Sequence, residues 1–238
     1  MKTIFIIILA GIACTFCANA QQYQAYLNKA NIRSVSFKLK NSSLRIIGTT
    51  NDSLTITVLG AGPINLQDGD SIDLHLAIAG QTLLAEKTSE TPKNYLVQIP
   101  KQIDLTIEEP FGPPQKLEII DMDAAVNVHS WVSKITLTNN KGPANVKSEA
   151  ADIFVTLPPG LDQPYSLTSR GRLVDVTIPQ KDKITLDAEI VAGRLITDFS
   201  LNKRVETVIG DSLQTVKGPL NGGGTKLMVK ANTLVLHN

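Results

Sequence analysis

Short alternating apolar stretches recur along the chain from Ser34 to the C-terminus, and this period constrains the fold more than any other feature. Gly, Pro, Asn and Asp separate the stretches. Within a stretch, apolar and polar residues alternate, as in Ile103-Asp104-Leu105-Thr106-Ile107. Alternation with period two places the apolar side chains of a β-strand on one face, and segments this short leave no room for long helices. The sequence therefore predicts an all-β protein of many short strands joined by tight turns.

The spacing of the stretches favours a β-solenoid over a β-sandwich, which remains the alternative. In the second half of the chain, centres follow one another at about ten residues, the length of one strand and one corner. These centres lie near Ile135, Val146, Val155, Leu167, Val176, Leu186, Ile196 and Val208. In a solenoid each coil buries the apolar surface that its neighbour leaves open, so the terminal coils need caps.

The end of the chain has the pattern expected of a last coil. Leu227, Val229, Leu234 and Leu236 alternate with more polar residues. Gly222-Gly223-Gly224 before them predicts a turn too tight for side chains. We therefore expect residues 225–238 to form the final coil of the stack.

The domain organisation follows from the same pattern. Residues 21–33 precede the alternation, and we expect a short helical or irregular lead-in there. Residues 34–238 are expected to form one all-β repeat domain, because no long polar linker divides them. The Pro110-Phe111-Gly112-Pro113-Pro114 stretch is the candidate for an internal seam. Asp68-Gly69, Asn140 to Pro143 and Pro158 to Gly160 predict turns.

Residues 1–20 have the pattern of a secretory signal peptide. Lys2 precedes an apolar run, and Ala18-Asn19-Ala20 forms an A-x-A cleavage site before Gln21. The apolar run is shorter than the roughly 20 residues that a membrane span needs. An alternative is a lipoprotein signal ending at Cys14, although Gly11 stands where such signals usually have Leu. The sequence thus predicts export to the periplasm, the cell surface or the medium, with lipid anchoring at Cys14 as the alternative.

Cysteine and charge content exclude several classes of protein. Both cysteines, Cys14 and Cys17, lie in the predicted signal peptide, so residues 21–238 contain no thiol. Disulfides, thiol catalysis and cysteine metal sites are therefore excluded in the cleaved protein. The net charge of the chain is +1, which gives no electrostatic case for binding nucleic acid. No later stretch is apolar enough for a transmembrane segment.

Three segments resemble the putative adhesin family of exported bacterial proteins, known by a domain of the DUF4097 type. DIFVTLPPGLDQPYSLTSRGRLVDVTIP is similar to its repeated unit of a strand, an LP-G turn and a strand. KGPLNGGGTKLMVKANTLVLHN resembles the terminal signature of the family, and NSSLRIIGTTNDSLTITV its opening strands. The resemblance implies a single-stranded, right-handed, β-helix-like fold at the cell envelope and brings no catalytic residues.

Metal and phosphate sites find little support in the residues. His75, His129 and His237 are far apart in sequence and have no neighbours at ligand spacing. Asp68, Asp70 and Asp73 suggest a calcium site. The loop, however, has neither the glycine at the sixth position nor the distal glutamate of an EF-type site. Gly222-Gly223-Gly224 precedes a predicted strand, whereas a phosphate loop precedes a helix. We therefore expect no metal and no cofactor.

Catalytic groups are equally hard to assemble from the sequence. Ser166 and Ser169 lie in polar strands with no G-x-S-x-G motif. Glu108 and Glu109 point to opposite faces of a strand and so cannot act together on one glycosidic bond. Trp131, the only tryptophan, is either a core residue, which is the more common role beside valines, or an exposed platform for stacking a sugar.

The sequence thus predicts a non-catalytic, exported cell-envelope or surface module that binds a partner or has a structural role. The sequence does not identify the partner; an envelope glycan and an envelope protein are the two classes to test. The chief alternative is a carbohydrate-active enzyme, a polysaccharide lyase or hydrolase, on a β-solenoid scaffold. A third possibility, an accessory protein of envelope assembly, differs only in its partner. A groove lined by several carboxylates would favour the enzyme.

Overall fold

The computed structural model describes residues 22–27, 31–59, 72–199, 206–209 and 212–238. This part of the chain contains strands and turns but no helix, and therefore no helix that could span a membrane. The all-β prediction is confirmed. In chain order the strands are β1 (Gln22–Tyr26), β2 (Ser34–Lys38), β3 (Ser42–Thr49), β4 (Ser53–Leu59), β5 (Leu74–Ala79), β6 (Thr82–Lys87), β7 (Lys93–Pro100), β8 (Asp104–Glu109), β9 (Lys116–Ile120), β10 (Val126–Ser130), β11 (Lys134–Thr138), β12 (Ala144–Ser148), β13 (Ile153–Thr156), β14 (Tyr165–Ser169), β15 (Leu173–Thr177), β16 (Ile184–Thr197), β17 (Glu206–Ile209), β18 (Leu213–Leu220) and β19 (Thr225–His237).

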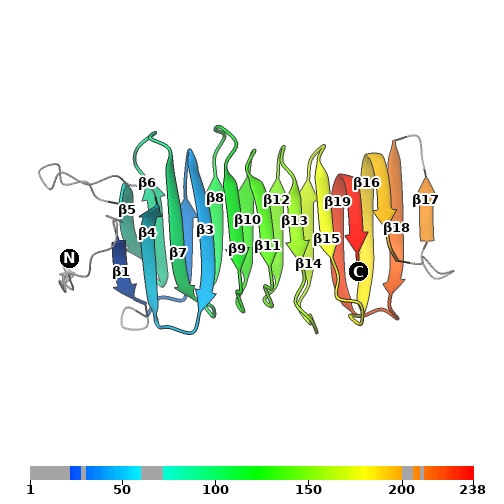
Figure 1. Ribbon diagram of the computed structural model, residues 1–238, viewed down its shortest axis with the longest axis horizontal. Helices are drawn as coiled ribbons and strands as arrows, with labels where there is room; N and C mark the ends of the chain where they lie inside the picture. The colour runs from blue at the N-terminus through cyan, green and yellow to red at the C-terminus, as the bar shows by residue number, and fades with distance from the viewer. Residues whose placement is uncertain (1–21, 28–30, 60–71, 200–205, 210–211) are drawn as a thin grey trace, which may run out of the picture.

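The middle of the chain forms coils of two strands each. β8 continues through a corner into β9, β10 into β11, β12 into β13, and β14 into β15 (Figure 1). The first strands of successive coils pair in parallel, in the order β2, β8, β10, β12, β14. The second strands do the same, in the order β3, β9, β11, β13, β15. The fold is therefore a solenoid with two sheet faces, which we call face I (with β8 and β10) and face II (with β9 and β11).

The apolar side chains that alternate in the sequence form a continuous core between the two faces. Ile135 and Leu137 of β11 are fully buried, whereas Thr136 and Thr138 between and after them are partly exposed. Other predicted inward positions are buried in the same way: Leu105, Ile107, Val146, Ile153, Val174, Val176, Ile184, Leu186 and Ala188. Burial of aliphatic side chains at roughly 25 cal/mol per Å² of apolar surface drives the stacking of the coils.

Antiparallel strands close the N-terminal end of the stack. The coil formed by β6 and β7 lies beyond the coil formed by β2 and β3, although it comes later in the chain. β5 pairs antiparallel with β6, β4 with β7, and β1 with β4. These antiparallel strands interrupt the regular parallel stack. An uncovered end of the stack would expose unpaired backbone groups to which another chain could pair.

The C-terminal strand is not the last coil, and our prediction for it is wrong. β19 lies inside the stack, between the coil formed by β14 and β15 and the strand β16 (Figure 1). β18 pairs antiparallel with β16, and β17 with β18, so these strands lie beyond it. Leu227, Val229, Leu234 and Leu236 are buried as expected, but they have neighbouring strands on both sides. The turn before β19 is confirmed, with positive φ at Gly222 and Gly223.

β16 spans two of the predicted centres in one bent strand. Leu186 lies in its first half, which belongs to face I, and Ile196 in its second half, which belongs to face II. The pairing with β19 shifts between Ile190 and Arg194. A Cβ atom added to Gly193 in this bend would lie 1.7 Å from the carbonyl oxygen of Asn232. Glycine therefore permits the two backbones to approach at this corner.

Two further expectations concern the first part of the chain. Residues 22–26, expected to be helical or irregular, form β1 instead, because Tyr23 and Ala25 alternate with polar residues and pack against the core. The 110–114 stretch forms the corner between β8 and β9. The predicted signal peptide and Asp68-Gly69 lie outside the described residues.

Candidate functional site

The three histidines lie on different parts of the solenoid. His75 belongs to β5 at the N-terminal end, and His129 to β10 in the middle of face I. His237, at the end of β19, lies 3.2 Å from Asp175 Oδ1 and 3.6 Å from Asp198 Oδ2. Within the described ranges, no three His, Cys, Asp or Glu side chains are arranged to hold a metal ion.

The acidic loop and the glycine run also have structural explanations where they are described. Asp68 and Asp70 lie outside the described residues. Asp73 accepts hydrogen bonds from Thr88 Oγ1 at 3.2 Å and from Ser89 Oγ. Gly222-Gly223-Gly224 is followed directly by the strand β19, so no helix N-terminus is present there to bind a phosphate.

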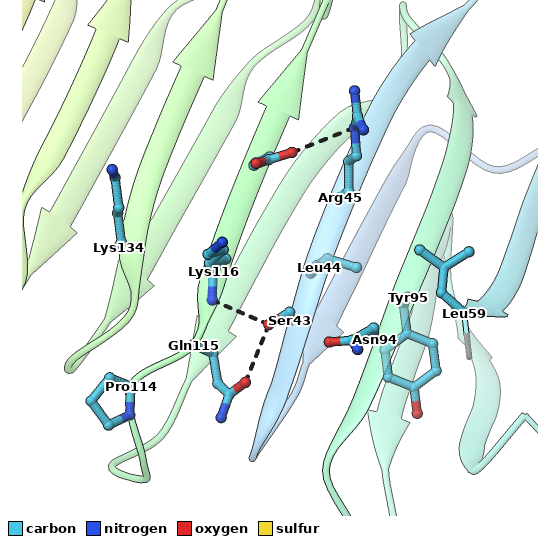
Figure 2. Close-up of a pocket in the computed structure, with 11 residues that line it drawn as sticks. Ser43, Leu44, Arg45, Leu59, Asn94, Tyr95, Pro114, Gln115, Lys116 and Lys134 are labelled. Carbon is cyan, nitrogen blue, oxygen red and sulfur yellow. Dashed lines mark hydrogen bonds and ion pairs between the residues drawn. The ribbon is translucent and has the colours of Figure 1, made fainter. Parts of the chain in front are cut away.

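A shallow groove of about 540 Å³ lies on face II (Figure 2). Ser43 connects two strands at its floor, because its Oγ donates to Gln115 Oε1 at 3.2 Å and accepts from the backbone N–H of Lys116 at 3.3 Å. Glu118 is the only carboxylate among the lining residues, and its Oε2 lies 3.4 Å from Arg45 Nε. The groove thus offers hydrogen-bonding groups and positive charge, but no pair of carboxylates for acid–base chemistry.

Lysines extend the positive charge of this groove. Lys116 and Lys134 occupy paired positions on β9 and β11, and both line the groove. Lys134 Nζ lies 4.1 Å from the centroid of the Phe154 ring on the next strand, which is a cation–π distance. Such a surface can attract an anionic group without performing catalysis.

An exposed aromatic pair occupies the corner where face I turns into face II. Phe111 lies in the corner between β8 and β9, and Trp131 in the corner between β10 and β11. Their ring centroids are 5.8 Å apart with an interplanar angle of 89°, an edge-to-face arrangement. Phe111 is 69% exposed and Trp131 is 42% exposed. The core assignment for Trp131 is therefore wrong, because its ring is exposed.

A buried carboxylate connects the two corners that present these rings. Glu109 precedes the Phe111 corner and accepts hydrogen bonds from Ser130 Oγ and Ser133 Oγ of the Trp131 corner. The backbone N–H of Gln115 donates to Ser133 Oγ at 3.2 Å. Burial raises the pKa of Glu109 above its ordinary value, and the two serine hydrogen bonds oppose that rise. As predicted, Glu109 points inward and Glu108 outward.

Corner serines continue this pattern along the stack. Ser130, Ser148 and Ser169 are paired in register on β10, β12 and β14, and all three are buried. Ser148 Oγ accepts from the N–H of Ala151 at 2.9 Å, and Ser169 Oγ donates to the carbonyl of Ala151 at 2.7 Å. Sequence reasoning considered Ser169 only as a nucleophile and missed Ser130 and Ser148. The signal was a serine at the end of three alternate strands, β10, β12 and β14, each followed by a corner.

Charged side chains surround Glu149 at the next corner. Its carboxylate oxygens lie 2.6 Å from Lys147 Nζ, 2.9 Å from an Arg170 guanidinium nitrogen and 3.2 Å from His129 Nε2. The hydrogen bond from Lys147 is the main cause that lowers the pKa of Glu149, with smaller contributions from His129 and Arg170. Glu149 thus remains ionised, and the two permanent cations around it leave a local excess of positive charge.

Comparison with known proteins gives distant similarity only. No protein-family model matches the sequence, and no curated protein matches it. A putative cell adhesion protein from Clostridium sporogenes is 12% identical, with 93% of this chain and 98% of that chain covered and a TM-score of 0.47. A putative adhesin from Bacteroides fragilis is 10% identical, with coverage of 92% and 97% and a TM-score of 0.32. A putative adhesin from Parabacteroides merdae is 8% identical, with coverage of 92% and 96% and a TM-score of 0.24. Similarity at this level supports no conclusion about individual residues or about activity.

Proposed function

We propose that the protein is a non-catalytic, exported binding module of the cell envelope or surface, of the adhesin type. The observation that carries this proposal is the composition of the groove on face II. Its only carboxylate, Glu118, is engaged by Arg45. Enzymes that hydrolyse glycosidic bonds use two carboxyl groups about 5–9.5 Å apart. A groove with one engaged carboxylate favours binding over hydrolysis.

The regular spacing of the solenoid suits the recognition of an extended partner. Coils in a parallel stack repeat at about 4.7–4.9 Å, so equivalent side chains form rows along the stack. On face I one such row contains Thr106, Asn127, Asn145 and Ser166 in register. These side chains offer hydrogen-bond donors and acceptors at a constant interval, as a polysaccharide or an extended envelope protein requires.

Export and domain organisation belong to the same proposal. The signal-like pattern of residues 1–20 supports export from the cytoplasm, with lipid anchoring at Cys14 as the alternative. Residues 34–238 act as one repeat domain, with the corner at 110–114 as an internal feature of the stack. The resemblance of three sequence segments to the DUF4097-type family agrees with a location at the cell envelope.

The experiment that tests this function uses the purified protein comprising residues 21–238. It is applied to an array of envelope glycans and, separately, to envelope extract for pull-down of protein partners. Each glycan that binds is then incubated with the protein, and new reducing ends and unsaturated sugars are measured. We expect saturable binding without product formation. Cleavage of a bound polysaccharide would contradict the proposal and favour a hydrolase or lyase on the same scaffold.

A further inference from the structure

Exposed large apolar side chains are not spread evenly over the described residues. Eight of them lie on the strands that form the two ends of the stack: Tyr26, Leu59, Ile78, Leu84, Val191, Ile196, Ile209 and Leu213. The other two, Phe111 and Trp131, lie in the middle of the molecule and contact each other. The residues of the first group belong to the strands that close the stack at its two ends. The aromatic pair lies away from both ends, and more than half of the Phe111 surface is exposed. This pair therefore needs a different explanation.

The platform under the pair is rigid. Glu109 is buried and binds both serines of the Trp131 corner. The carbonyl of Trp131 also accepts a 2.7 Å hydrogen bond from the N–H of Ala150 in the next corner. Rings on such a support lose little conformational freedom when a ligand binds, which favours affinity. The flat apolar face of a sugar ring is suited to stack on an exposed indole.

Positive charge lies one and two coils along the stack from Trp131, at Lys147 and Arg170. Trp131, Glu149 and Arg170 each follow one of the in-register serines Ser130, Ser148 and Ser169, so they occupy equivalent places in three successive corners. At about 4.7–4.9 Å per coil, Arg170 is displaced from Trp131 by roughly 10 Å along the stack. Arg170 is 66% exposed in its side chain, and Lys147 is 40% exposed. Both cations can reach a ligand that lies on Trp131 and extends along the corner.

We propose that this corner, formed by Phe111, Trp131, Lys147 and Arg170, binds an acidic polysaccharide. One sugar ring stacks on Trp131, and the carboxylate or sulfate of the same or the next sugar is bound by Arg170 and Lys147. Glu149 cancels one of the two permanent positive charges of Lys147 and Arg170, so the cluster keeps an excess of positive charge for the anion. This inference rests on the proposed binding function and adds to it a site at the corner, separate from the groove on face II, and a ligand class.

The test uses the intrinsic fluorescence of the protein. Trp131 is the only tryptophan, so its emission reports on this corner and on no other place. Residues 21–238 are titrated with oligogalacturonate as the acidic probe and with dextran oligosaccharide as the neutral probe. We expect a saturable emission change with oligogalacturonate that weakens as salt is raised, and none with dextran.

Variants measured by calorimetry give an independent readout. We expect Trp131→Ala and Arg170→Ala each to weaken oligogalacturonate binding by about tenfold or more. Ile196→Ala is the matched apolar control, since Ile196 is 43% exposed against 42% for Trp131. Lys217→Ala is the matched charged control, because Lys217 forms a 3.2 Å ion pair with Asp187 and lies on β18, three strands beyond β14. Both controls should leave affinity unchanged. The fluorescence titration needs no substitution and so holds even if a variant folds poorly.

The outcomes separate this inference from the proposed function. Binding of oligogalacturonate or another glycan without a change at Trp131 would overturn the corner site and leave the binding module intact. Equal responses to both probes would overturn the requirement for an acid group. No response to oligogalacturonate in either assay would overturn the ligand class. Cleavage of the probe would overturn the non-catalytic function itself.

Discussion

The position of β19 inside the stack gives a prediction about the C-terminus. Deletion of residues 225–238 removes a strand that pairs with β14, β15 and β16. It removes four buried aliphatic side chains, Leu227, Val229, Leu234 and Leu236. At roughly 1.5–3 kcal/mol for each side chain, the loss is about 6–12 kcal/mol, which is comparable with the net stability of a whole domain, about 5–15 kcal/mol.

The expected result is unfolding of β16, β17 and β18 together with aggregation, rather than local fraying. Without β19, the strand β16 has no partner on its inner side, and β14 and β15 expose their edges and the core. Light scattering and a thermal melt of residues 21–224 measure the effect, and limited proteolysis should cut within 184–220. In the full-length protein, Leu234→Ala should lower the free energy of unfolding by about 2–5 kcal/mol. Val235→Ala should lower it much less, because the adjacent Val235 side chain is partly exposed.

A truncated protein that stays monomeric with an unchanged melting temperature would refute this reasoning. It would mean that β16 reaches the β14–β15 coil without β19 and that the terminal strand adds little. A similar cost for Leu234→Ala and Val235→Ala would also contradict it, because burial would then not determine the loss.

Three further predictions concern the corners and the N-terminus. Because burial raises the pKa of Glu109 above its ordinary 4.5, the wild type should lose stability as the pH rises from 4.5 through the folded-state pKa. Glu109→Gln should remove this loss. Urea unfolding at several pH values should therefore show a difference in the free energy of unfolding between the two proteins that grows with pH and then levels off. A difference that is the same at every pH would contradict the prediction. Gly193→Ala should destabilise the protein by about 1–3 kcal/mol or more, because its Cβ would lie 1.7 Å from the carbonyl oxygen of Asn232. Gly160→Ala is the control: a Cβ atom there would meet no atom within 4 Å, so this variant should cost only the strain of its positive φ. Intact-mass analysis of exported protein should give a chain that begins at Gln21; a diacylated cysteine would instead show the lipoprotein alternative.

The candidate site could be predicted only in part. The sequence identifies Trp131 as a candidate for stacking a sugar, but it does not indicate that Phe111, twenty residues earlier, lies beside it. The contact exists because equivalent corners of successive coils are one strand spacing apart. The contacts of Glu109 also could not be predicted from the sequence. Its inward direction follows from alternation, but its serine partners come from the next coil, 21 and 24 residues away.

Most strands from Ser34 onward and the core could be predicted from the sequence, because alternation and turn residues act within a few neighbouring residues; β1 and the continuous strand β16 could not. Ile135, Val146 and Val176 are buried where period two places them. The order of the coils at the two ends could be seen only in the folded structure. β16 and β19 have the same alternation, so either could pack against β14 and β15 by pattern alone. In the observed arrangement β19 lies between the β14–β15 coil and β16, so the backbone groups on both edges of β19 are paired. The other edge of β16 then pairs with β18. That choice depends on long-range backbone pairing, which no local pattern encodes.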